Sequence, residues 1–363
     1  MRIVIDGRFY GLEHGGLGRY TTELINSLSK IDTKNKYFVL LRKKYFETLK
    51  LPKNWDKVLV DYKHYTFAEQ INLPKIINKL NPDLTHFLHF NTPLFMKGPY
   101  VVTIHDMIMH ESKGIDTTTL PSYQYLFKRV GYRLAFWNAV KRASKIITPS
   151  VVVKNNIVDY FRVNPDEVCV THLGINKSFF DYEGAVKKED YFLYVGSAYP
   201  HKNLISLIKA VKKLDTKLVI VSSRNVFTKR LQKTIRELDA EKNIKLVGYL
   251  DDIKLKRLYA KAIAFVYPSL LEGFGFQGLE AMARKTLLLS SDTKVFKEVY
   301  KDNAIYFDPK DVDSITNALK KTGEMKVNET KKRINKAYLY AKKFTWQKTA
   351  QKTLDLYDEF SEK

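Results

Sequence analysis

Short apolar runs alternate with longer amphipathic segments along the whole chain. Segments 17–29 and 204–211 repeat apolar side chains at helical spacing. The short runs between such segments are rich in β-branched and aliphatic residues, as is typical of strands buried on both faces. The alternation predicts an α/β fold of parallel sheets with crossover helices. Ten runs are predicted as strands: residues 3–5, 37–41, 101–104, 145–148, 191–195, 217–221, 244–247, 262–266, 286–289 and 304–307.

The alternation pauses once, over residues 176–190, where charges and Gly184 replace the periodic apolar pattern. A chain of 363 residues is long enough for two domains. The sequence therefore predicts two doubly wound, Rossmann-like domains of similar size, 1–178 and 179–344, facing each other across a cleft. We expect a final helix in 345–363 that packs back on the first domain. Ligands of such sheets bind at the carboxyl ends of strands, which directs attention to the polar residues that follow the apolar runs.

The chain is strongly basic. It has 62 Lys and Arg against 39 Asp and Glu, a net charge of +23, and this balance favours anionic partners such as phosphates, acidic lipids or nucleic acid. No run of five basic residues occurs, which argues against a nucleic-acid-binding arm. We expect an anionic membrane surface as an additional partner and no nucleic acid.

Targeting signals and cysteine usage bear on the compartment. The first apolar run is too short for a signal peptide, and no run reaches the roughly 20 residues that span a bilayer. Cys169 is the only cysteine, so an internal disulfide is impossible and a reducing cytosol fits. The expected location is the cytoplasm, with peripheral attachment to the inner face of the plasma membrane.

The strongest chemical signal follows the strand predicted at 262–266. Glu272 lies in a turn with Gly275, and Glu280 lies in the helix that comes next. Glycine lets the backbone approach a ligand closely, and a helix start suits a phosphate. The two glutamates could then accept hydrogen bonds from hydroxyl groups of the same ligand. The competing interpretation is an ordinary strand, turn and helix with exposed glutamates.

Glu272 and Glu280 have seven residues between them. This arrangement resembles the E-x7-E motif of retaining glycosyltransferases of family 4, which have the GT-B fold and include bacterial polysaccharide mannosyltransferases. The resemblance covers nearly the whole chain. It implies that Glu280 binds ribose hydroxyls and that Glu272 binds the donor sugar beside its anomeric carbon. It also implies further donor contacts, to the base at the end of the strand at 244–247 and to the sugar diphosphate at the helix start: Tyr249, Leu250, Gly275, Phe276 and Gln277.

A second polar segment follows the strand predicted at 191–195. Lys202 precedes a helix there, and its charge could neutralise a leaving diphosphate. An ordinary lysine at a helix start is the alternative. By resemblance, Lys202 and Asn203 match a family segment of the type Arg-Lys-Asn, but His201 replaces the usual arginine. Ser197 also stands where some members carry a phosphate-binding arginine, so the residues that balance the diphosphate charge stay open.

Two further candidates lie in the first domain. The glycine-rich segment 14–20 opens a helix, and the resemblance implies that Gly16 lies over the donor phosphates. No acidic residue follows the second strand, which argues against an NAD site. His105 ends the strand at 101–104; it is either a structural histidine paired with Asp106 or, as the resemblance implies, a residue that contacts the donor sugar and assists catalysis.

No metal-binding motif is present: the sequence has neither HExxH, nor a cysteine cluster, nor an EF-hand loop. Asp251 and Asp252 are expected to begin a helix. We therefore expect a hexosyltransferase without metal or cofactor that uses a nucleotide sugar, with GDP-mannose as first choice, and a saccharide or lipid-linked acceptor. The alternatives are another GT-B enzyme, such as an epimerase or phosphorylase, and a degenerate, non-catalytic protein that binds membranes or nucleic acid.

Overall fold

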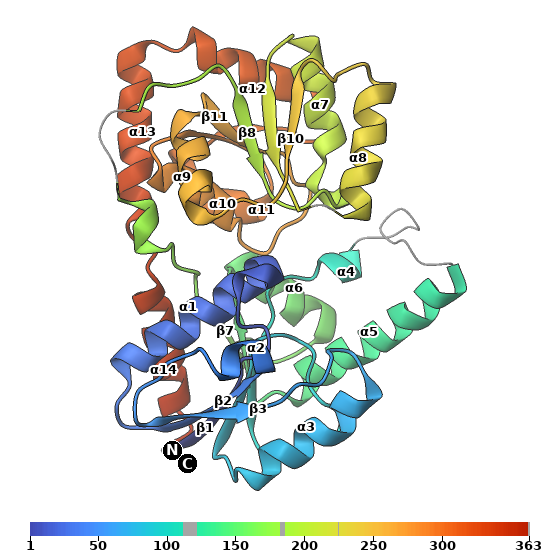
Figure 1. The fold of residues 1–363 in the computed structure, drawn as a ribbon, viewed down its shortest axis with the longest axis vertical. Helices are drawn as coiled ribbons and strands as arrows, with labels where there is room; N and C mark the ends of the chain where they lie inside the picture. Colours follow the sequence, from blue (N-terminus) through green and yellow to red (C-terminus); the bar gives the residue numbers. More distant parts are fainter. Residues whose placement is uncertain (112–121, 182–185, 224, 362–363) are drawn as a thin grey trace. The chain divides into compact units, whose positions relative to one another are not determined.

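The computed structural model describes residues 1–111, 122–181, 186–223 and 225–361 (Figure 1). Residues 182–185 of the predicted linker lie outside these ranges. The chain divides into two compact units. Unit 1 comprises Met1–His110, Pro121–Gly174 and Thr345–Lys363, and unit 2 comprises Glu111–Leu120 and Ile175–Phe344. The last segment of the chain thus belongs to the same unit as the first.

Unit 1 contains a seven-stranded sheet in which every neighbouring pair of strands is parallel. The strand order is β3-β2-β1-β4-β5-β6-β7, so β1 lies inside the sheet and the order reverses direction there. The strands are β1 (Arg2–Asp6), β2 (Lys36–Leu41), β3 (Trp55–Leu59), β4 (Leu84–Phe87), β5 (Tyr100–Thr103), β6 (Lys145–Thr148) and β7 (Val168–Val170).

Helices cover both faces of this sheet. Successive strand residues point to opposite sides, so each strand contributes side chains to the packing on both faces. On one face, Val4 and Val102 join a core with Phe136. On the other face, α1 packs against α14, and Tyr20 of α1 reaches Thr103. The helices of unit 1 are α1 (Gly15–Ile31), α2 (Lys43–Phe46), α3 (Phe67–Lys79), α4 (Ile108–Glu111), α5 (Ser122–Arg142), α6 (Val151–Phe161) and α14 (Trp346–Asp358), with short 3-10 helices at Leu12–His14 and Pro165–Glu167.

Unit 2 repeats the architecture with a six-stranded parallel sheet of order β10-β9-β8-β11-β12-β13. Its strands are β8 (Phe192–Val195), β9 (Leu218–Val221), β10 (Ile244–Val247), β11 (Ala264–Tyr267), β12 (Leu287–Ser291) and β13 (Ile305–Phe307). Its helices are α7 (Leu204–Lys213), α8 (Val226–Glu237), α9 (Asp252–Lys261), α10 (Phe276–Ala283), α11 (Lys294–Tyr300), α12 (Val312–Glu324) and α13 (Val327–Ala341), with 3-10 helices at Lys177–Phe179, Pro200–Lys202 and Lys301–Asn303.

The predicted fold class is confirmed: two doubly wound units of parallel strands and helices. All ten predicted runs fall on strands, with ends that differ by no more than two residues. Asp251 caps α9 as predicted, since its side chain accepts a hydrogen bond from the Lys254 amide at 2.8 Å. In the part of the chain that the structure describes, no helix combines the length and hydropathy that crossing a bilayer requires.

Candidate functional site

The turn between β11 and α10 requires glycine at its last position. Gly275 has φ of +90°, a left-handed conformation that L side chains rarely adopt. A Cβ added there would also come within 2.2 Å of the Tyr300 hydroxyl. The helix α10 therefore begins directly after a sharp backbone turn at the carboxyl end of a fully buried strand, and no side chain caps its first turn. This is the position that the sequence assigned to a donor phosphate.

Lys202 and Glu272, predicted separately, form an ion pair. The Lys202 ammonium group donates to the Glu272 carboxylate. Their side chains are only 13% and 10% exposed, and the Lys202 Nζ lies 6.0 Å from the centre of the Tyr267 ring. A cation and a carboxylate are thus held side by side at the carboxyl ends of β8 and β11.

Asn203 connects the segment that carries Lys202 to the ends of two other strands. Its side-chain amide donates to the carbonyl of Pro268 at 3.2 Å and of Pro309 at 2.6 Å. Its φ of +56° places it in the left-handed region, which asparagine tolerates better than most residues. The Leu270 amide also donates to the His201 carbonyl at 2.8 Å. These bonds fix the position of Lys202 relative to the β11–α10 turn.

Three buried tyrosines surround the pair, and the sequence analysis missed them as site residues. Tyr194 donates to the carbonyl of Ser197 at 2.8 Å, Tyr300 donates to the carbonyl of Gly275, and Tyr267 donates to the Gln277 side chain at 2.7 Å. Burial, and after it the negative charge of Glu272, raises the pKa of all three phenols far above the usual value. They therefore remain protonated donors that stabilise the loops of the site. For Tyr194 and Tyr267 the available signal was a tyrosine near the end of a buried strand, whereas Tyr300 is the last residue of α11.

His201 does not replace the charge of the family arginine. Burial, followed by the neighbouring charge of Lys202, lowers the pKa of His201 to about 4, against the opposing effect of Glu272. The imidazole is therefore neutral at pH 7. Ser197 is half-buried and engages Tyr194 through its carbonyl. Of the residues in this segment, Lys202 alone supplies a fixed positive charge.

The other predicted donor residues differ in exposure. Glu280 is buried, and its carboxylate accepts a hydrogen bond from the Tyr259 hydroxyl at 3.1 Å. Phe276 and Gln277 form the first turn of α10, next to the ion pair. Tyr249 is 69% exposed after β10, and Leu250 is half-buried beside it; no contact of either residue with the ion pair is found in the described residues. The structure thus brings together Lys202, Glu272, Gly275, Phe276 and Gln277.

His105, the candidate in unit 1, has a defined tautomer. Its Nε2 lies 3.0 Å from the Leu88 carbonyl, an acceptor, so Nε2 carries the proton and Nδ1 keeps a lone pair. The ring packs edge-on against Tyr20, with centroids 4.6 Å apart. Burial lowers the pKa of His105 to about 4, so the imidazole is neutral at pH 7. Asp106 instead accepts from the Ile108 amide at 3.0 Å.

The glycine-rich segment forms the first turn of α1 rather than a separate loop. Gly18 is required by packing, because a Cβ there would approach the Gly11 carbonyl oxygen to 1.9 Å. Gly16 has no atom within 4 Å of such a Cβ, so the structure leaves open space beside it. Tyr20, one helical turn after Gly16, is the residue that contacts His105. The two predicted residues of unit 1 therefore lie near the same end of α1.

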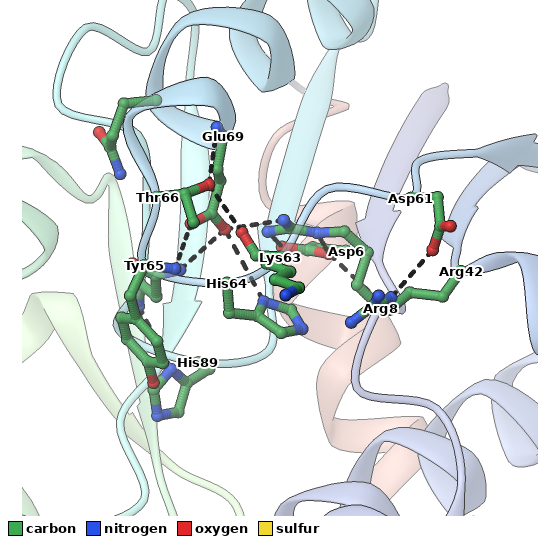
Figure 2. Close-up of polar contacts among 12 residues, drawn as sticks. Asp6, Arg8, Arg42, Asp61, Lys63, His64, Tyr65, Thr66, Glu69 and His89 are labelled. Carbon is green, nitrogen blue, oxygen red and sulfur yellow. Dashed lines mark hydrogen bonds and ion pairs between the residues drawn. The ribbon is translucent and has the colours of Figure 1, made fainter.

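A second buried ion cluster lies after β1, and sequence reasoning missed it (Figure 2). Arg8 donates to both carboxylate oxygens of Asp6, at 2.7 and 2.6 Å, and its Nη1 lies 2.7 Å from Glu69. Glu69 also accepts from the Asn91 side chain at 2.8 Å. The His64 ring stacks on Phe9, with centroids 3.8 Å apart, and its Nδ1 lies 3.7 Å from Glu69. An Asp-x-Arg sequence directly after a buried strand was the signal.

Burial would raise the pKa of Glu69, but His64, the charge of Arg8 and the Asn91 amide together lower it to about 2. Glu69 is therefore ionised at all ordinary pH values. Among the described residues, no group of three or more histidine, cysteine, aspartate or glutamate side chains is arranged to hold a metal ion. The absence of a required metal or cofactor, and the individual roles of the site residues, stay predictions.

Comparisons with known proteins agree along the chain. Residues 14–179 match the family described as "Glycosyltransferase Family 4", and residues 176–340 match "Glycosyl transferases group 1". The O-antigen chain mannosyltransferase RfbU of Salmonella typhimurium is 32% identical over 260 residues, which cover 70% of this chain and 69% of RfbU. The O-antigen chain mannosyltransferase B of Escherichia coli is 27% identical over 276 residues, 71% of this chain and 69% of that protein.

Solved structures show the same fold at low sequence identity. Sucrose-phosphate synthase of Thermosynechococcus elongatus has a TM-score of 0.77 at 16% identity, covering 99% of this chain and 98% of its own. Anabaena HepE, solved with UDP and glucose, has a TM-score of 0.76 at 16% identity, covering 99% and 100%. WaaG, a glycosyltransferase involved in lipopolysaccharide biosynthesis, has a TM-score of 0.72 at 14% identity, covering 98% and 99%. These matches confirm the predicted GT-B fold.

Proposed function

The chain belongs to glycosyltransferase family 4, and from this premise we propose that it is a retaining hexosyltransferase that moves mannose from GDP-mannose to a saccharide or lipid-linked saccharide. The observation that carries the proposal is the Lys202–Glu272 pair beside the start of α10. A sugar diphosphate needs a cation for its phosphates and an acceptor for its hydroxyls. This pair offers both within one partly buried contact.

In the proposed donor complex, the Lys202 ammonium group donates some of its hydrogen bonds to the diphosphate. Glu272 then accepts hydrogen bonds from the sugar hydroxyls near the anomeric carbon, and Glu280 accepts from the ribose. The backbone N–H groups of the first turn of α10 add the positive end of the helix dipole. Because His201 is neutral, Lys202 carries most of the charge compensation in this segment.

Retention is proposed without a glutamate nucleophile. Glu272 is held by Lys202, and in this role it orients the sugar. The leaving diphosphate, stabilised by Lys202, accepts the proton of the acceptor hydroxyl as the new glycosidic bond forms on the face from which the diphosphate departs. This differs from retaining glycosidases, in which a second carboxylate attacks the sugar.

His105 is proposed to accept a hydrogen bond rather than to supply a charge. Its Nε2 proton is committed to Leu88, and its lowered pKa keeps Nδ1 unprotonated at pH 7. A neutral imidazole with a free lone pair can accept from a donor-sugar hydroxyl. Gly16, with open space beside it, is proposed to let the donor phosphates approach the first turn of α1.

Mannose is the first choice of sugar because RfbU of Salmonella typhimurium and the O-antigen chain mannosyltransferase B of Escherichia coli are described as mannosyltransferases. The structural neighbour crystallised with UDP and glucose keeps UDP-glucose as the competing donor. We propose that the reaction requires no metal, and EDTA should leave the transfer rate unchanged.

The test uses the purified full-length chain with GDP-mannose, UDP-glucose or ADP-glucose and octyl α-mannoside as acceptor. We expect thermal stabilisation by GDP-mannose, since a ligand that binds only the folded state raises its stability, and an α-linked product by NMR. Glu272→Gln should bind GDP with little change but transfer at least 100-fold more slowly, on the order of one lost transition-state interaction. Glu241→Gln, at an exposed position after α8, is the matched control.

The outcomes separate the alternatives. An isomerised nucleotide sugar without transfer would indicate an epimerase, and phosphate-dependent release of a sugar phosphate would indicate a phosphorylase. Wild-type transfer by Glu272→Gln would contradict the assigned role of this residue. Failure of every donor to bind would favour a degenerate binding protein.

A further inference from the structure

Helix α5 is apolar on two opposite faces. Its inner face contributes Phe136, Ala139 and Val140 to the core of unit 1. Its outer face carries four large apolar side chains that are 51–64% exposed, and we call them the apolar stripe: Leu126, Val130, Leu134 and Trp137. Spacings of four, four and three residues place them along one side of the helix. Single exposed apolar residues are ordinary, but a continuous row indicates a binding surface.

The same helix is strongly basic. The sequence 122–142 contains five Lys and Arg residues and no Asp or Glu. Arg133 is three residues after Val130 and four before Trp137, so it lies on the side of the apolar stripe. Lys141 follows Trp137 by four residues and continues that side, and both cations are exposed. Of the charged residues that α5 itself carries, only cations border the stripe.

A neighbouring loop extends the surface beyond the helix. Leu94 and Phe95 are 37% and 80% exposed, and Lys97 is exposed beside them. Arg142, at the end of α5, donates to the carbonyl of Leu94 at 2.5 Å and of Met96 at 3.1 Å. These bonds fix the loop to the helix that bears the stripe.

Helix α3 is tied to this loop as well. The Leu94 amide donates to the Gln70 side chain at 2.8 Å, and α3 exposes Phe67 and Ile71, which are 86% and 58% exposed. Figure 1 shows the N-terminal half of α5 extending beyond the sheet of unit 1. Three connected segments of unit 1 thus present apolar side chains to solvent.

We propose that α5 and the 94–97 loop form a docking surface for a bilayer that contains anionic lipid. Interfacial helices combine an apolar face that enters the acyl boundary with Lys and Arg that reach the headgroups. Tryptophan favours this boundary because its ring is apolar and its N–H is polar. A nucleic acid would use the cations but leave Leu126, Val130 and Leu134 in water. A symmetric contact with a second copy would bring two acid-free, basic helices together.

This inference rests on the proposed function in one respect: a lipid-linked acceptor would place the substrate at the same bilayer. Docking itself needs neither donor nor acceptor. It can therefore be measured on the full-length chain without any nucleotide sugar, and its failure is distinguishable from a failure of sugar transfer.

Trp137 provides a direct signal for the experiment. The chain has three tryptophans, and Trp55 and Trp346 are 4% and 5% exposed, against 52% for Trp137. Vesicles of phosphatidylcholine with 30 mol% phosphatidylglycerol should shift the emission to shorter wavelength, and a brominated lipid should quench it. Trp137→Phe should retain sedimentation with the vesicles but lose most of both signals. Vesicles of pure phosphatidylcholine should bind at least tenfold more weakly.

Two double variants test the two components of the surface. Val130→Ser/Leu134→Ser removes half of the apolar stripe, and Lys128→Glu/Arg133→Glu reverses two exposed charges; each should weaken vesicle binding at least tenfold. The matched control is Val327→Ser/Leu339→Ser, at positions 68% and 62% exposed on α13 of unit 2, which should bind like the wild type. Circular dichroism confirms that each variant folds.

Several results would overturn the proposal. One is the absence of binding to the anionic vesicles; another is equal binding by wild type and both double variants. A dimer in solution that Val130→Ser/Leu134→Ser dissociates would assign the stripe to a second copy instead. Tight RNA binding that the charge-reversal variant alone abolishes, without vesicle binding, would assign the cations to nucleic acid.

Discussion

Each unit holds an ion pair at the carboxyl ends of its strands, and the two differ in burial, in the number of partners and in the cation. Arg8 is 0% exposed and contacts two carboxylates, Asp6 and Glu69. The Lys202–Glu272 pair is 13% and 10% exposed and joins one ammonium group to one carboxylate. Arginine forms fixed, forked contacts, whereas lysine is a point charge on a flexible stem. The difference separates a contact built for structure from one that a ligand can share.

The largest expected effect concerns acid stability, because seven of the eight histidines belong to unit 1. Burial is the first cause that lowers the pKa of His86 and His89 to about 3 and of His105 and His110 to about 4. The folded unit keeps these rings neutral, while the unfolded chain binds protons below about pH 6.5. Each of these histidines therefore lowers the free energy of unfolding by up to about 1.4 kcal/mol per pH unit as the pH falls below 6.5.

Tryptophan fluorescence can follow this loss in unit 1 selectively. Trp55, Trp137 and Trp346 all belong to that unit, whereas far-UV circular dichroism reports helices of both units. Between pH 6.5 and 4, the urea midpoint measured by fluorescence should fall faster than the midpoint measured by circular dichroism, because the helices of unit 2, which has only His201, also contribute to the dichroism. Coincident transitions throughout the range would show that the units do not differ in this way.

The next effect is that of Arg8→Met. Removing this guanidinium leaves Asp6 and Glu69 buried without their cation, and breaking a buried pair costs about 3–5 kcal/mol. Urea unfolding followed by tryptophan fluorescence measures the change. Arg42→Met is the matched control: Arg42 and Asp61 form a pair with side chains 32% and 50% exposed, and such pairs contribute about 0–1 kcal/mol. Equal destabilisation by the two variants would remove the distinction drawn from burial.

Lys202→Met should affect activity more than stability. We expect sugar transfer to fall at least 100-fold, of the order seen when a transition-state donor is lost, with a smaller loss of stability than for Arg8→Met. The double variant Lys202→Met/Glu272→Gln leaves no unpaired charge, so it should regain stability relative to Lys202→Met without regaining transfer. A double variant less stable than Lys202→Met would show that the contact has a structural role like that of Arg8.

The smallest effect is expected for Tyr300→Phe, which removes the bond to the Gly275 carbonyl. Loss of one hydrogen bond costs about 1 kcal/mol, and the looser start of α10 should raise the KM for the donor. Tyr191→Phe removes a similar bond, to the Leu258 carbonyl at 2.9 Å, at the amino end of β8 and so away from this turn. It should cost comparable stability and leave the KM unchanged; a raised KM in both variants would make the effect nonspecific.

The ten predicted runs account for most of the two sheets but leave out β3, β4 and the three-residue β7. Strand β3 lies at the edge of the sheet, and its sequence Trp-Asp-Lys-Val-Leu mixes charged and apolar residues. Strand β4 is buried but contains Thr85 and His86. His86 is accommodated because Thr103 and Tyr357 form hydrogen bonds with its two ring nitrogens, at 2.9 and 2.5 Å. Partners from such distant segments leave no trace in a local pattern.

The candidate site in unit 2 could also be predicted only in part from local sequence patterns. The types and spacing of Lys202, Glu272 and Gly275 identified these residues as candidates, because strand ends and glycine turns are local features. Their pairing, the three tyrosine hydroxyls and the neutral state of His201 depend on tertiary contacts. Arg8 was missed for this reason as well: its partner Glu69 is 61 residues away.

For the segment Ile175–Phe344, the chain leaves and re-enters unit 1 at nearly one point. Ile175 donates its amide to the Phe344 carbonyl at 3.1 Å, and Gly174 lies so close to the Trp346 backbone that an added Cβ would be 2.1 Å from its nitrogen. The two ends of Ile175–Phe344 therefore lie next to each other, as the ends of a domain inserted into another domain do. An inserted domain of this kind can be exchanged between related genes without lengthening either junction, so the proposed donor-binding residues of unit 2 can be inherited separately from the proposed docking surface of unit 1.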